Sequence, residues 1–223
     1  MKARTLTVWM TGLLLSASFT SNAQNVPVAT GRYTPDWDNL AQWECPEWFQ
    51  NVKFGIWAHW DPQSQGADGD WYGRGMYFKG GGNYNWHVSH FGDPCVAGTD
   101  YGYKDLCNAW KPEYLIRLYY DMGARYFFAM GQHHDNFDCW DSPYQPWNSV
   151  NIGPKRDVVG EWAKACEKYD LPLGVSMHGS HAWLWFEIAQ QYDANMTKED
   201  GKGKWWEGYD PHDLYAQRHT PSR

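Results

Sequence analysis

The fold class is decided by the stretch Arg125-Tyr-Phe-Phe-Ala-Met-Gly131, a short and mainly apolar run in the middle of the 223-residue chain. Two runs of the same kind lie on either side of it, Val52-Lys-Phe-Gly-Ile-Trp57 before it and Leu173-Gly-Val-Ser-Met177 after it. Runs this short predict β-strands, and nearly continuous apolar runs are typical of parallel strands that are buried on both faces. We therefore expect three parallel strands.

An amphipathic helix is predicted between each pair of neighbouring strands. The first spans residues 112–123 and the second spans residues 158–169, which Asp157 caps. The apolar positions at helical spacing are Leu115, Leu118, Tyr119 and Met122 in the first helix and Val158, Trp162, Ala165 and Cys166 in the second. Strands that alternate with helices in this way predict βα units around a parallel sheet.

Two architectures are built from such units. A doubly wound sheet usually carries a Gly-rich phosphate loop after its first strand, but here that place is taken by His59-Trp60-Asp61-Pro62. A (β/α)8 TIM-like barrel carries its chemistry at the carboxyl end of every strand, which matches the polar residues found there. We expect an α/β fold of the barrel type. Because a complete barrel takes about 250 residues, only its first three or so βα units are expected in this chain, which would then be truncated.

The first 23 residues have the three-part pattern of a secretory signal peptide. Lys2 and Arg4 precede a short apolar run, and Ser21 and Ala23 supply small residues at the cleavage positions. The run is too short for the alternative of a membrane anchor, which needs about 20 apolar residues. We predict that residues 1–23 are removed, that residues 24–223 form the N-terminal part of one catalytic barrel, and that the protein is secreted or periplasmic.

Composition restricts the class of partner. The formal net charge is −7 and the sequence has no cluster of Lys and Arg, which argues against nucleic acid or an anionic membrane surface as partner. Sixteen Trp and 15 Tyr exceed what a core of this size needs. The excess fits either the stacking of sugar rings on aromatic side chains or an aromatic-rich core, and composition alone does not separate the two.

Five cysteines occur in a chain that is expected to reach an oxidising compartment. Cys95 and Cys107 flank one Gly-rich loop, so they are predicted to form a disulfide. Cys166 lies on the apolar stripe of the second helix and is interpreted as a buried, unreactive thiol.

Polar side chains follow each predicted strand within a residue or two. His59 comes after the first strand, His133 and His134 after the second, and His178 after the third. Because the carboxyl ends of parallel strands meet at one edge, these histidines are expected to converge in one mouth.

A metal site and a sugar site are the alternatives for this histidine set. A metal could be held by His59, His133, His178 and Asp135, but no tight ligand spacing supports it. In an extended strand the neighbours His133 and His134 would face opposite ways, which disfavours joint chelation. Neutral imidazoles that hydrogen-bond sugar hydroxyls are the simpler interpretation, since each ring offers one donor and one acceptor. No metal and no cofactor are therefore expected.

Four segments carry a family resemblance. They are Lys53-Phe-Gly-Ile-Trp-Ala-His-Trp60, Asp70-Trp-Tyr-Gly-Arg-Gly-Met76, the stretch 124–138 with Gln132-His-His-Asp-Asn-Phe-Asp138, and Lys155-Arg-Asp-Val-Val-Gly-Glu-Trp162. In order and spacing they resemble the successive blocks of the retaining α-L-fucosidase family of glycoside hydrolases. The resemblance implies a (β/α)8 catalytic domain that cleaves terminal α-L-fucosyl linkages with retention, with a fucosylated glycan or oligosaccharide as substrate.

The resemblance also implies roles for single residues. His59, His133 and His134 would bind fucose hydroxyls, and Trp71 would line the sugar subsite. Asp70 stands where the family usually has Glu. His178 is a further candidate contact, at a strand end where family members commonly show Tyr. The nucleophile, an Asp at the end of the fourth strand, is expected after Arg223, and the acid/base later still.

Other interpretations accompany these roles. Asp135 and Asp138 are interpreted as loop or cap residues rather than catalytic carboxylates, and Lys155-Arg156-Asp157 as the start of a helix. Trp140, Trp147 and Trp162 are expected to pack in the core. A retaining glycosidase needs two carboxyl groups about 5–5.5 Å apart, and no convincing pair is visible here. This chain alone is thus expected to be inactive. The alternative function is a non-catalytic carbohydrate-binding fragment or pseudoenzyme.

Overall fold

The computed structural model describes residues 31–66, 68–69, 71–94, 109–179, 187–189 and 197–214. The chain divides into two units, residues 1–45 and residues 46–223. Within the first unit, helix α1 (Trp37–Leu40) begins at Asp36, whose carboxylate accepts a hydrogen bond of 2.9 Å from the main-chain N–H of Asn39. The predicted signal peptide and the predicted Cys95–Cys107 bridge both lie outside the described residues.

The second unit is built on the three predicted strands. They are β1 (Ile56–Ala58), β2 (Phe127–Gln132) and β3 (Leu173–Met177), and they form a parallel sheet in the order β1-β2-β3. Ile56 is in register with Phe127, which in turn is in register with Leu173. The register of β3 against β2 shifts near Gly131, between Met130 and Gln132. The predicted α/β organisation with a parallel sheet is therefore confirmed.

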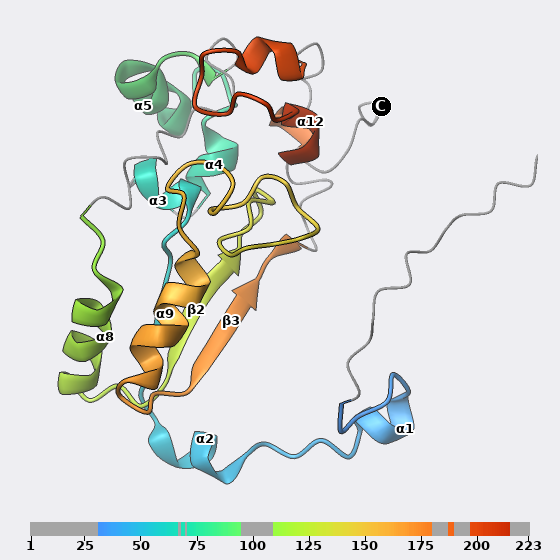
Figure 1. Ribbon diagram of the computed structural model, residues 1–223, viewed down its shortest axis with the longest axis vertical. Helices are drawn as coiled ribbons and strands as arrows, with labels where there is room; N and C mark the ends of the chain where they lie inside the picture. The colour runs from blue at the N-terminus through green and yellow to red at the C-terminus, as the bar shows by residue number, and fades with distance from the viewer. Residues whose placement is uncertain are drawn as a thin grey trace, which may run out of the picture. The chain divides into compact units, whose positions relative to one another are not determined.

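The two predicted helices are α8 (Pro112–Asp121), which joins β1 to β2, and α9 (Val158–Glu167), which joins β2 to β3. They lie side by side along the sheet in Figure 1. Asp157 caps α9 by accepting a hydrogen bond of 2.8 Å from Gly160 N–H, as predicted. The buried residues of α9 are the predicted stripe, Val158, Trp162, Ala165 and Cys166. On α8 the prediction is only partly right, because Ile116 is the buried residue whereas Leu118 and Met122 are exposed.

Aromatic rings join the helices to one face of the sheet. Phe127 of β2 stacks on Tyr119 of α8, with 5.9 Å between the ring centroids, and lies 4.7 Å from the ring of Trp162 on α9. Phe127 and Trp162 are fully buried. This contact is the centre of the core, and each such aromatic side chain buries roughly 150–250 Å² of surface.

The opposite face of the sheet is less completely covered. It carries a hollow of about 320 Å³ lined by Phe49, Gly55, Ile56, Trp57, Tyr126, Phe128, Ser176 and His178. Phe49 comes from helix α2 (Glu47–Val52). A Cβ atom at Gly55 would collide with the ring of Tyr126, and one at Gly174 would collide with the ring of Phe128. The rings of Tyr126, directly before β2, and Phe128, on β2, therefore fill the space beside Gly55, directly before β1, and Gly174, on β3.

Burial of every strand on both faces was expected, and this expectation is wrong for the outer strands. Trp57 of β1 is 50% exposed, and Val175 and Met177 of β3 are 44% and 51% exposed. The physical reason is that, among the described residues, β1 and β3 each pair only with β2 and so form the edges of the sheet.

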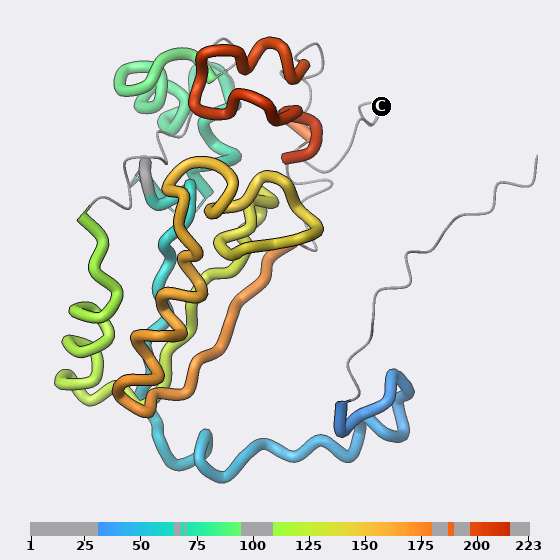
Figure 2. The backbone as a smooth tube through the Cα atoms, in the orientation of Figure 1, coloured from blue at the N-terminus to red at the C-terminus, as the bar shows by residue number. Residues whose placement is uncertain are grey.

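The loops at the carboxyl ends of the strands form a second layer (Figure 2). This layer holds the short helices α3 (Pro62–Gly66), α4 (Tyr72–Gly75), α5 (Gly82–Phe91), η2 (Lys198–Gly201) and α12 (Pro211–Leu214). The indole of Trp147 is buried, as predicted, and donates a hydrogen bond of 2.7 Å to the main-chain oxygen of Asp210. The amide of Asn136 likewise donates to Leu214 O at 2.8 Å. The loop after β2 is thereby tied to residues 210–214.

None of the helices in the described part of the chain is long and apolar enough to cross a membrane.

Candidate functional site

The sheet brings the predicted histidines together. His59, His133 and His178 directly follow the ends of β1, β2 and β3. The ring centroids of His59 and His133 are 5.1 Å apart, and those of His133 and His178 are 4.7 Å apart. His134 completes the group, with its ring 5.1 Å from that of His178. We refer to His59, His133, His134 and His178 as the histidine cluster.

The expectation that His133 and His134 face opposite ways is wrong. Their ring centroids are 4.6 Å apart, and one ring nitrogen from each of His133, His134 and His178 lies within 4.8 Å of the other two. Strand β2 ends at Gln132, and His134 already belongs to a turn. The alternation of side chains along a strand therefore no longer applies to this pair.

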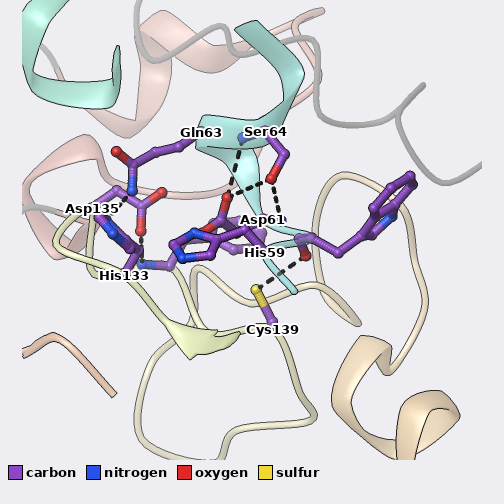
Figure 3. A network of polar contacts seen from close by, with 9 residues as sticks. His59, Asp61, Gln63, Ser64, His133, Asp135 and Cys139 are labelled. Carbon is purple, nitrogen blue, oxygen red and sulfur yellow. Dashed lines mark hydrogen bonds and ion pairs between the residues drawn. The ribbon is translucent and has the colours of Figure 1, made fainter. Parts of the chain in front are cut away.

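His133 is oriented by a hydrogen bond from Gln63, a residue that the sequence analysis did not single out. The side-chain amide of Gln63, at the start of α3, hydrogen-bonds Nδ1 of His133 inside the protein (Figure 3). The His133 side chain is almost fully buried, and its Nε2 has no hydrogen-bond partner among the described residues. Burial lowers the pKa of His133 to about 4, helped by the neighbouring histidines and opposed by the Asp61 carboxylate. His133 is thus a neutral imidazole at neutral pH.

His134 is fixed from its other side. Its Nδ1–H donates a hydrogen bond of 3.0 Å to the main-chain oxygen of His178. A neutral ring with its proton on Nδ1 has an acceptor lone pair on Nε2. The end of β3 therefore sets the tautomer of a residue that follows β2.

A buried carboxylate lies beneath the cluster. Asp61 is fully buried, and its Oδ1 accepts hydrogen bonds from the main-chain N–H of Ser64 at 3.1 Å and from its hydroxyl at 3.0 Å. Its Oδ2 lies 3.5 Å from Nδ1 of His59. Burial acts to raise the pKa of Asp61, but the interactions with His59, His133 and Ser64 outweigh it and lower the pKa. Asp61 is thus an ionised group that holds His59 in place (Figure 3).

Two further carboxyl groups were interpreted as loop or cap residues. Asp135 does accept a hydrogen bond of 3.2 Å from Phe137 N–H in a turn, but its side chain is fully buried. Burial raises its pKa well above the usual range, and the charge of Asp61 adds to this effect. Asp138 accepts a hydrogen bond of 2.6 Å from the Gln132 amide, and burial raises its pKa as well. Both carboxyls therefore support the loop after β2 from within the core.

The chain matches the family model "Alpha-L-fucosidase" over residues 20–219. It belongs to the alpha-L-fucosidase family. The tissue alpha-L-fucosidase of Homo sapiens is 34% identical over 176 residues, which cover 77% of this chain and 38% of the human protein. A putative alpha-L-fucosidase of Caenorhabditis elegans is 35% identical over 150 residues, which cover 64% of this chain and 30% of the relative. The chain thus spans less than two fifths of the length of these relatives.

Solved structures of fucosidases share the fold. The Thermotoga maritima alpha-fucosidase in complex with fucose is 31% identical with a TM-score of 0.56, and the match covers 66% of this chain and 37% of that one. An alpha-L-fucosynthase of the same organism, in complex with a difucoside azide, is 33% identical with a TM-score of 0.58 and covers 66% of this chain and 38% of its own. The family assignment from sequence is confirmed.

The remaining site candidates of this fucosidase-family chain are placed less fully. Trp71 precedes α4 and is 61% exposed, and Asp70 lies outside the described residues. An indole that the sequence did not single out, Trp57, packs on the histidine cluster, with its ring centroid 4.7 Å from His59 and 5.9 Å from His178. Trp57 lies two residues before His59 on β1, so strand alternation was the signal that could have found it. No comparable signal marked Gln63.

Proposed function

We propose that this chain forms the sugar-binding wall of a glycoside hydrolase that cleaves terminal α-L-fucosyl linkages with retention. In this proposal β1, β2 and β3 are the first three strands of a (β/α)8 barrel. Three features support it: the parallel order of the strands, the helices along one face of the sheet, and the polar residues at one edge. The family assignment supplies the reaction class.

The observation that carries the proposal is the pairing of two tautomers. The amide N–H of Gln63 donates to Nδ1 of His133, so the proton of this neutral ring is on Nε2, where it can be donated. His134 donates from Nδ1 to His178 O, so in its neutral form Nε2 is an acceptor. One sugar hydroxyl can therefore accept from His133 and donate to His134. A hydroxyl needs both kinds of partner when it leaves water, because an unmatched buried polar group costs about 1–3 kcal/mol.

An apolar surface lies next to these polar groups. Trp57 is half-exposed and packs on His59, so part of its indole is available to the C–H face of a sugar ring. A mostly apolar wall with a few placed polar groups is the usual composition of a small-molecule site. The wall is therefore suited to a neutral, partly deoxygenated sugar such as fucose.

The chemical step needs groups that this wall does not provide. Asp135 and Asp138 are buried and hydrogen-bonded within the loop after β2, while Asp61 is committed to His59 and Ser64. A retaining mechanism requires one carboxylate that attacks the anomeric carbon and a second carboxyl group that protonates the leaving oxygen. We propose that both come from parts of the enzyme outside the described residues. Binding by the wall alone would not lower the chemical barrier.

The test is the release of 4-nitrophenol from 4-nitrophenyl α-L-fucoside by the whole enzyme and by residues 24–223 alone. Turnover is expected from the whole enzyme and not from residues 24–223. His133→Ala in the whole enzyme should reduce kcat/KM at least tenfold, whereas His90→Ala, an exposed histidine on α5, should leave it unchanged. Proton NMR of the first product should show retention as the α-anomer.

Three outcomes would contradict the proposal. Turnover by residues 24–223 would show that its own carboxyl groups supply the chemistry. A first product with the β-anomeric configuration would exclude retention. Fucose binding by a well-folded whole protein without any turnover would favour the non-catalytic carbohydrate-binding alternative.

A further inference from the structure

The ring nitrogens at the ends of β2 and β3 are close enough for a second kind of ligand. One nitrogen from each of His133, His134 and His178 lies within 4.8 Å of the other two. Nitrogens that share a tetrahedral metal ion at about 2.0–2.1 Å are about 3.3 Å apart. Rotations about the side-chain torsions of the three residues can bring their ring nitrogens to this spacing. We propose that His133, His134 and His178 bind one divalent transition-metal ion of the kind that prefers imidazole, such as Zn²⁺ or Ni²⁺.

His134 is already arranged as a metal ligand. Metal-binding histidines usually donate their second ring N–H to a carbonyl or carboxylate, which fixes the tautomer and orients the ring. His134 does this through Nδ1, with the main-chain oxygen of His178 as acceptor at 3.0 Å. The nitrogen that it would offer to a metal is therefore Nε2, in the form that carries a lone pair.

His133 needs one local change to become a ligand. Its Nε2 is buried and lacks a hydrogen-bond partner among the described residues, but this nitrogen carries the proton while Gln63 donates to Nδ1. Turning the Gln63 amide by half a revolution places Oε1 on Nδ1 instead. His133 then donates from Nδ1 to Gln63, and Nε2 gains the lone pair that a metal requires.

The surroundings of Gln63 permit this change. Its Oε1 is a buried atom without a hydrogen-bond partner in the described part of the protein, so turning the amide breaks only the bond to His133, which is re-formed with the opposite polarity. The two amide orientations present the same shape to the core. A sugar hydroxyl and a metal ion thus select opposite tautomers of one histidine.

The charge around the site is also suitable. The Asp61 carboxylate interacts with both His59 and His133, so a negative group lies beside the proposed ion. Three protein ligands leave a fourth tetrahedral position for water or another oxygen ligand, as in open zinc sites. The ion would therefore remain exchangeable rather than structural.

Calorimetric titration of the full-length protein tests the proposal. The protein carries no polyhistidine tag, is stripped with EDTA and is dialysed before ZnCl₂ is added. One Zn²⁺ per chain is expected. His134→Ala and His178→Ala should each weaken binding at least tenfold, and the matched control His90→Ala should leave it within threefold of the unaltered protein. No binding at up to about 1 mM Zn²⁺, a level at which ΔG° is only about −4 kcal/mol, or equal affinity in all variants, would overturn the proposal.

A second measurement needs no variant, so it does not depend on whether the substituted proteins fold. Co²⁺ added to the unaltered protein should give the intense visible d–d absorption of a four-coordinate site with nitrogen ligands. A weak spectrum like that of hexahydrated Co²⁺ would overturn the proposal. Neither measurement involves fucoside turnover, so the metal site and the proposed hydrolase activity can fail separately.

Discussion

His134 donates a hydrogen bond from Nδ1 to the main-chain oxygen of His178, and this 3.0 Å contact joins two loops that are 44 residues apart in sequence. It ties the end of one strand to the side chain that follows another. The strands place side chains at one edge of the sheet. In addition, the main-chain oxygen at the end of β3 determines that Nδ1 of His134, after β2, carries a proton. The fold thus sets which ring nitrogen of His134 donates a hydrogen bond.

The role of Gln63 can be tested by removing its amide while keeping its shape. Gln63→Leu leaves Nδ1 of His133 without its donor, so the ring no longer has a fixed tautomer. We expect KM for 4-nitrophenyl α-L-fucoside to rise roughly tenfold in the whole enzyme, with kcat much less affected, since about 1.4 kcal/mol of binding is lost. Gln42→Leu, at an exposed position, is the matched control. A purely structural role for Gln63 would instead lower thermal stability without separating KM from kcat.

The cap of α9 should have a measurable energy. Asp157→Ala removes the acceptor for Gly160 N–H at the start of the helix, so the free energy of unfolding should fall by about 1 kcal/mol. Urea unfolding followed by circular dichroism measures the change. Asp121→Ala, in an exposed ion pair with Arg117 at the end of α8, should change stability by less than about 0.5 kcal/mol. Equal losses in both variants would contradict the importance of the cap.

The buried thiol of α9 predicts a pH dependence at the alkaline end. Burial raises the pKa of Cys166 to about 11, so the folded state holds its proton more tightly than the unfolded state does. The resulting stabilisation is complete below about pH 9 and is lost as the pH rises through about 11. The free energy of unfolding of the unaltered protein should therefore fall more steeply between these pH values than that of Cys166→Ala. The raised pKa of Tyr119 affects both proteins alike and cancels in the comparison. Parallel curves would refute the prediction.

Export remains a prediction from the first residues. When the gene is expressed in a bacterium with a general secretory pathway, the mature protein should begin at Gln24. N-terminal sequencing of the exported protein checks this. Ala23→Arg should block cleavage, because the position before the cut takes a small residue. If the unaltered protein and Ala23→Arg both keep Met1 as their first residue, the signal peptide is excluded.

The sequence predicted the sheet and the convergence of the histidines because both follow from periodicity. Apolar runs identify the strands, and parallel pairing then brings His59, His133 and His178 to one edge. The orientation of His134 could not be predicted, because it depends on where β2 ends and on a turn that the side-chain pattern does not encode. Gln63 was missed for a similar reason. The sequence does not indicate that a glutamine in a polar loop is buried, and its contact with His133 depends on the path of α3.

The pairs Gly55–Tyr126 and Gly174–Phe128 have a consequence for how this protein can change over time. In each pair the aromatic ring occupies the space that a side chain at the glycine would need. A larger residue on an outer strand is acceptable only if the opposing aromatic ring shrinks at the same step. Among homologous chains, these positions should therefore co-vary in size, and attempts to widen the hollow lined by Tyr126 and Phe128 should alter them in pairs.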